Sequence, residues 1–109
     1  MLKKAISPLA FVVGAILAAA APAYAAPHTF TVVNHAQYKV TVVKISPENT
    51  NRWGPNLLGV ETLKRGGTIG FLVKAPCLED VLVVYGNGVK EWHRNTSTCN
   101  TLVLTYRYP

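Results

Sequence analysis

Apolar and polar residues alternate through most of the chain after its N-terminal region, and this pattern predicts short β-strands. In segment 28–34 (His-Thr-Phe-Thr-Val-Val-Asn), Phe30 and Val32 fall on one face and the threonines on the other. In segment 38–45 the apolar phase shifts at Val43. Such a shift indicates a bulge or a strand that passes between two sheets.

The second half of the chain repeats this pattern. Segments 69–73 and 101–108 alternate, whereas segment 81–85 (Val-Leu-Val-Val-Tyr) is apolar throughout, as in a strand covered on both faces. Segments 60–63 and 89–93 are predicted as two further short strands. No run with the 3.6-residue period of a helix follows the N-terminal region.

Turn-forming residues separate the predicted strands. The triplet Gly86-Asn87-Gly88 supplies the positive φ that a tight hairpin needs, because glycine and asparagine reach that region at low cost. Segment 64–67 is a second predicted turn. Segment 46–59 is rich in Pro, Asn and Gly, which is typical of a long loop with an exposed tip.

Six or seven short strands without a helix predict an all-β fold. The expected architecture is a small antiparallel β-sandwich. A small open barrel is the alternative.

The N-terminal region has the features of an export signal. Two lysines and a long apolar stretch precede Ala23-Tyr24-Ala25, whose small alanines fit signal peptidase. We expect residues 1–25 to be a signal peptide cleaved after Ala25, and residues 26–109 to form one domain with no transmembrane span. That domain would be periplasmic or secreted.

Composition and charge narrow the classes of partner. Half of the residues are hydrophobic and the net charge is +6, of which Lys3 and Lys4 contribute two units. Among the remaining basic residues only Lys64 and Arg65 are adjacent, and no aromatic residues are interleaved for stacking. Nucleic acid is therefore not an expected partner. We expect a monomer whose partner is an unidentified protein or an anionic component of the cell envelope.

Cys77 and Cys99 are the only cysteines. Because an exported chain meets an oxidising environment, we expect them to form a disulfide bond. Closing so long a loop would stabilise the fold by about 3 kcal/mol. The bridge is interpreted as structural, since redox-active cysteines usually form a Cys-x-x-Cys pair.

Candidate catalytic residues are scarce. Neither Ser46 nor Ser97 lies in a Gly-x-Ser-x-Gly motif. Glu79 and Asp80 are adjacent, so on a strand their side chains would point to opposite faces and could not act on one bond. Asp80 is predicted instead to accept hydrogen bonds from nearby backbone N–H groups. We therefore predict that the chain is not an enzyme.

The three histidines, His28, His35 and His93, lack the spacing of metal ligands. They are interpreted as surface residues. No metal and no other cofactor is expected.

The tryptophans Trp53 and Trp92 are candidates for the core or for a recognition surface. An indole offers a large apolar surface and one N–H donor, which suits a core as well as a recognition surface. The preferred interpretation is that Trp53, in the long loop, lies beneath the sandwich and plugs one end of the core, and we predict that Trp53→Ala destabilises the fold. If it is exposed, Trp53 can recognise a partner together with its neighbour Arg52 and with Trp92.

An ordered set of motifs extends over nearly all of the chain after the signal. It comprises Trp-Gly-x-x-x-Leu-Gly at 53–59, Gly66-Gly67, Cys77-x-x-Asp80, Tyr85, Asn87-Gly88, Trp92 and Cys99. In this set the chain resembles a group of small exported bacterial proteins, most of them uncharacterised. The resemblance implies the same β-rich fold and the same disulfide, and it implies no activity. Asn87 stands where the group commonly has an acidic residue, and the loop around Arg52 is basic, which argues against cation binding here.

The hypothesis from sequence is an exported, non-catalytic β domain of a Gram-negative bacterium that binds a partner or belongs to the envelope. The alternative is an inhibitor of an exported hydrolase, a lysozyme or a protease, with segment 49–56 as the inhibitory loop. A third hypothesis is a small enzyme. It would require a pocket in which a histidine meets a carboxylate or Ser46.

Overall fold

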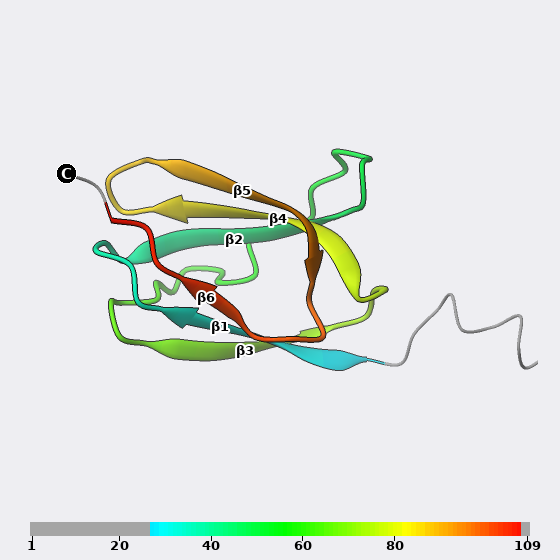
Figure 1. Cartoon of the computed structure of the whole chain (residues 1–109), viewed down its shortest axis with the longest axis horizontal. Coiled ribbons are helices and arrows are strands. Elements are labelled where there is room, and N and C mark those ends of the chain that lie inside the picture. Colours follow the sequence, from blue (N-terminus) through cyan, green and yellow to red (C-terminus); the bar gives the residue numbers. More distant parts are fainter. Residues whose placement is uncertain (1–26, 108–109) are drawn as a thin grey trace, which may run out of the picture.

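The computed structural model describes residues 27–107, which form two three-stranded β-sheets (Figure 1). The strands are β1 (His28–Asn34), β2 (Val40–Pro47), β3 (Thr68–Val73), β4 (Leu78–Tyr85), β5 (Lys90–Ser97) and β6 (Leu102–Leu104). One sheet has the order β3-β1-β6 and the other the order β2-β4-β5. The two sheets lie face to face (Figure 1), so the predicted all-β sandwich is confirmed.

The predicted signal peptide and the cleavage site at Ala25 lie outside the described residues. Within residues 27–107 no helix is long and apolar enough to cross a lipid bilayer.

The alternation seen in the sequence directs one face of each strand into the space between the sheets. Phe30 and Val32 of β1 are fully buried there, as are Val81 and Val83 of β4. The core consists of Phe30, Val32, Ala36, Val40, Val43, Leu58, Leu63, Phe71, Val73, Val81, Val83, Tyr85 and Leu104. Strand β4 is central in its sheet, and Leu82 on its outer face, paired with Trp92 of β5, is also only 7% exposed.

Three of the strand pairs are antiparallel, but β1 and β6 are parallel. The sequence did not indicate this pair. After β5 the chain changes sheets before it forms β6, so β6 runs beside β1 in the same direction (Figure 1).

Two predicted strands are shorter than expected. Within the described part of the segment predicted at 101–108, only Leu102–Leu104 form a strand, β6. The carbonyls of Leu104 and Tyr106 accept hydrogen bonds from the N–H groups of His35 and Gln37, in the turn that follows β1. Of the segment predicted at 60–63, only Leu63 makes a β-bridge, to Val40.

Irregular pairing occurs at two places in the β2-β4-β5 sheet. The register of β2 against β4 shifts between Val40 and Val42, which confirms the bulge predicted from the apolar phase. A second shift, between Glu79 and Val81 in the pairing of β4 with β5, was not predicted. It lies at the start of β4, where two adjacent carboxylates are buried.

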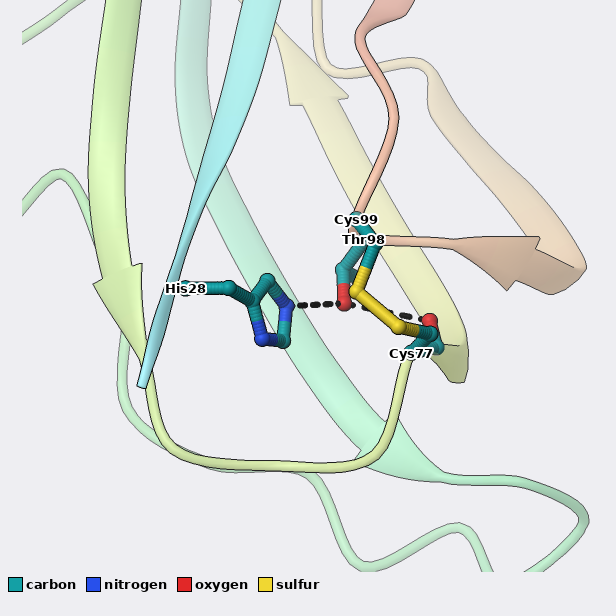
Figure 2. The surroundings of a disulfide bond; sticks show 4 residues. All are labelled: His28, Cys77, Thr98 and Cys99. Carbon is teal, nitrogen blue, oxygen red and sulfur yellow. Dashed lines mark hydrogen bonds between the residues drawn. A yellow bond between two sulfur atoms is a disulfide. The ribbon is translucent and has the colours of Figure 1, made fainter. Parts of the chain in front are cut away.

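The predicted disulfide between Cys77 and Cys99 is confirmed, with a Cα–Cα distance of 5.2 Å. It joins the start of β4 to the segment after β5 (Figure 2). The Thr98 hydroxyl donates to the Cys77 carbonyl at 3.1 Å and lies 2.8 Å from Nε2 of His28. Because that hydroxyl has a single hydrogen, it accepts from His28. These contacts connect the disulfide to the first residue of β1 in the other sheet.

Candidate functional site

An aromatic and cationic cluster covers part of the outer face of the β2-β4-β5 sheet. The rings of Trp53 and Trp92 lie 5.5 Å apart, and the Arg94 guanidinium lies 5.9 Å and 5.5 Å from their centroids. These distances suit cation–π contacts with both rings. We call Trp53, Trp92 and Arg94 the aromatic platform. Trp92 remains 47% exposed, so the platform is open to solvent.

Asp80 fixes the Arg94 side chain of the platform through an ion pair. Its side chain is fully buried, and Oδ2 accepts a hydrogen bond from Nη1 of Arg94 at 3.0 Å. The backbone N–H of Asn49 donates to Oδ2, and that of Asn95 donates to Oδ1, both at 3.1 Å. These backbone hydrogen bonds, together with Arg94, hold the pKa of Asp80 below its usual value of 3.8 although burial opposes them.

The backbone around Asp80 adopts an unusual conformation at three asparagines. Asn49, Asn51 and Asn95 have φ values of 61°, 55° and 50°. Asparagine is one of the few residues other than glycine that tolerates this left-handed region. The loop after β2 and the end of β5 are therefore shaped locally so that their N–H groups converge on one carboxylate.

The loop after β2 is fixed at its far end by a single amide side chain. The Asn56 side chain makes four hydrogen bonds of 3.0–3.2 Å, with Thr41, Val43, Leu58 and Gly59. The Gly54 and Leu57 N–H groups also bond to carbonyls of β2, at 3.0 and 2.7 Å. The loop thus follows the outer edge of β2, with its tip projecting from one end of the sandwich (Figure 1).

A groove of about 870 Å³ lies on the other side of this loop, at the end of the sandwich. Its walls are largely aliphatic: Ile45, Pro47, Gly54, Ala75, Pro76, Cys77 and Leu78. Four charged residues complete the lining, namely Glu48, Arg52, Lys74 and Glu79. Ile45 and Ala75 also pack against the core, so the floor of the groove adjoins the interior of the sandwich.

Glu79 is the buried carboxylate of this groove. It is 3% exposed, yet its carboxylate makes no hydrogen bond or ion pair with another residue in 27–107. Burial, and secondarily the negative charges of Asp80 and Glu48, raise the pKa of Glu79 above its usual value of 4.5. In the described part of the chain, His28 Nδ1 is the only fully enclosed side-chain polar atom without a partner, so the Glu79 oxygens retain contact with the groove.

A third polar cluster lies at the start of β5. Oε1 of Glu91 accepts from the Tyr85 hydroxyl at 2.7 Å and lies 2.8 Å from Nε2 of His93. Burial and Glu91 raise the pKa of Tyr85, which holds its hydroxyl in the protonated, donating form. A histidine thus meets a carboxylate, as the enzyme hypothesis requires, but none of the three residues lines the groove.

The other candidate residues are placed as follows. His35 is exposed, whereas His28 and His93 are partly exposed and hydrogen-bonded to Thr98 and Glu91. Across residues 27–107 no three metal-ligating side chains are grouped closely enough to hold an ion. In the hairpin, Gly88 has a φ of 88° and Oδ1 of Asn87 accepts from the Val89 N–H at 3.1 Å.

The structure separates two residues that are adjacent in the sequence. Trp53 belongs to the platform, whereas its neighbour Arg52 lines the groove on the other side of the loop. Trp53 is half-buried and is not part of the core of the described domain. It contacts Trp92 and Arg94, and both the plug and the recognition role stay predictions.

Arg94 and Glu79 were not predicted from the sequence as site residues. Trp92 and Arg94 are two residues apart in one strand, and this spacing places them on the same face, so the pairing could have been predicted. Glu79 lines a groove formed with the loop after β2 and the connection between β3 and β4, beside a register shift whose extra residue lies in β5. The sequence carries no local signal for either feature.

A scan against protein-family models found no match to the chain, and searches of the curated proteins and of the solved structures found no match either.

Proposed function

We propose that the chain is an exported, non-catalytic binding domain that recognises a partner through the aromatic platform. The observation that carries this proposal is the exposure of Trp92 beside a guanidinium that a buried carboxylate holds in place. Exposed tryptophan and arginine side chains are enriched among residues that contribute most to protein interfaces.

Rigidity supports this assignment. Arg94 loses side-chain entropy already in the free protein because Asp80 and the two indoles fix its guanidinium. A partner that stacks on the platform therefore meets a preorganised surface, which reduces the entropic cost of association.

Charge favours a protein partner over an anionic surface. The positive charge of Arg94 is offset by Asp80, so the platform presents aromatic faces rather than a net positive field. The disulfide supports an oxidising compartment, in agreement with export to the periplasm or the medium.

Inhibition of an exported hydrolase is the second candidate function. The loop after β2 supports it, because its tip projects from the sandwich (Figure 1) and its backbone is fixed by Asp80 and Asn56. Rigid projecting loops on disulfide-linked domains are well suited to occupy an active-site cleft.

A pull-down from envelope extract tests the proposal. The oxidised protein cleaved after Ala25 is immobilised, and proteins retained at low and moderate salt are identified by mass spectrometry. We expect a partner that resists moderate salt and that is lost with Trp92→Ala, because the contact is mainly aromatic. A retained hydrolase whose activity falls on binding would select the inhibitor function.

Leu72→Ala is the matched control, since Leu72 is 71% exposed and lies on β3, in the other sheet. It should retain the partner. Retention by Trp92→Ala at the wild-type level would refute the platform as the binding surface. Measuring the melting temperature of Trp53→Ala alongside separates recognition from a stabilising role of that ring.

A further inference from the structure

The groove beside the loop contains a carboxylate without a protein partner, and the aromatic platform does not explain it. Exposed charges such as Arg52 and Lys74 are hydrated and need no protein partner. Glu79 is different, because the residue is only 3% exposed and its carboxylate, which keeps contact with the groove, has no partner among residues 27–107. A buried polar group without a partner is costly, so most such groups in proteins are hydrogen-bonded.

The neighbours of Glu79 determine which partner would suit it. The charges that act on its carboxyl group are those of Asp80 and Glu48, both negative, and Glu48 also lines the groove. Asp80 already has three donors on the outer face of the sheet. Glu79 therefore lies in a locally negative part of the groove, which favours a positively charged group.

The walls of the groove indicate what kind of molecule would carry this positively charged group. Ile45, Pro76 and Leu78 are aliphatic, and the volume of about 870 Å³ is in the range of small-molecule sites. A flexible aliphatic stem would bury its methylene groups against these walls, as lysine stems do on protein surfaces. The positions of Arg52 and Lys74 in the lining disfavour a ligand with several positive charges.

We propose that this groove is a binding site for a small primary alkylammonium ligand. The ammonium group pairs with Glu79, with Glu48 adding to the attraction, and the alkyl stem packs on Ile45, Pro76 and Leu78. This site is distinct from the aromatic platform, which lies on the other side of the loop.

Titration with n-hexylammonium, followed by backbone amide NMR of the oxidised exported protein, tests the proposal. We expect saturable shifts that map to the groove, and at least about tenfold weaker binding of hexanoate, which has the same stem and the opposite charge. Equal or tighter binding of hexanoate would overturn the proposal. It would show that Arg52 and Lys74 set the selectivity.

Glu79→Gln tests the assigned residue, and Glu61→Gln is its matched control because Glu61 is exposed and does not line the groove. Glu79→Gln should weaken hexylammonium binding about tenfold or more, whereas Glu61→Gln should leave it unchanged. Unchanged binding by a folded Glu79→Gln would refute the role of Glu79.

The unmodified protein provides a test that does not depend on any variant. Saturation with hexylammonium should lower the pKa of Glu79, measured from its side-chain carboxyl carbon, because a cation favours the ionised form. The control resonance is that of Glu61. An unchanged Glu79 titration at saturation would contradict the proposed ion pair.

Discussion

Glu79 and Asp80 are adjacent in β4 and both are buried, yet their carboxylates have opposite surroundings. Asp80 faces the outer side of the sheet and accepts three hydrogen bonds, from Arg94 and from two backbone N–H groups. Glu79 lines the groove and has no such partner among the described residues. Their pKa values are accordingly shifted in opposite directions.

This difference shows that burial alone does not decide what a carboxylate does. Desolvation raises the pKa of both groups, but at Asp80 the donors outweigh it. A carboxylate whose oxygens accept hydrogen bonds from the protein organises the structure around it, as Asp80 does for the loop and the platform. A carboxylate without protein donors remains able to bind a ligand.

The largest expected effect comes from removing the disulfide that lies just before both carboxylates. Cys77→Ser should lower the stability by about 3 kcal/mol, which corresponds to a decrease of roughly 15 °C in Tm for a domain of this size. Thermal unfolding under oxidising conditions measures it. The double variant Cys77→Ser with Cys99→Ser controls for the free thiol, and an unchanged Tm in both would contradict a stabilising bridge.

Asp80→Asn should have the next largest effect. The amide keeps the shape but turns one acceptor into a donor that faces a backbone N–H, and it removes the charge that holds Arg94. We expect a Tm lower by about 10 °C and increased mobility of the loop after β2. Glu61→Gln, a carboxylate change at an exposed site, should leave Tm within error. A wild-type Tm for Asp80→Asn would remove Asp80 as an organising residue.

Glu79→Gln should have a small effect of the opposite sign. A neutral amide avoids the cost of a buried, unpaired negative charge, so at pH 7 we expect Tm to rise by about 3 °C. The measurement is thermal unfolding at pH 7 beside the Asp80→Asn variant. A clear decrease would mean that the Glu79 carboxylate has a stabilising partner in the folded protein.

Much of the fold could be predicted from the sequence. Burial of one face of a strand leaves alternating apolar and polar residues, as Phe30 and Val32 illustrate in β1. The second half of β5, Arg94–Ser97 in sequence, was not predicted as strand. An edge strand that faces solvent need not be apolar, so its pairing with β4 leaves no periodic signal. The parallel pairing of β6 likewise depends on the crossing between sheets.

Less of the candidate site could be predicted from the sequence. The hydrogen-bonding capacity of Asp80 follows from its residue type, but its donors come from Asn49 and Asn95, which are distant from it in sequence. The groove forms only when the loop after β2 and the connection between β3 and β4 are brought to one end of the sandwich. Contacts of this kind are determined by tertiary structure rather than by local pattern.

The pH dependence of stability follows from the pKa shifts of Glu79 and Asp80. The raised pKa of Glu79 means that stability increases as the pH falls from neutrality towards 4.5, because the folded state binds the proton more tightly. The lowered pKa of Asp80 contributes stability that is present above 3.8 and is lost as the pH falls below that value.

The most direct test is a site-resolved NMR titration of the side-chain carboxyl carbons in the oxidised protein. We expect the pKa of Glu79 to lie above its usual value of 4.5 and the pKa of Asp80 below its usual value of 3.8 in the same sample. Coincident titration of the two residues, or the reverse order, would contradict the division between a carboxylate that organises the platform and one that is open to a ligand.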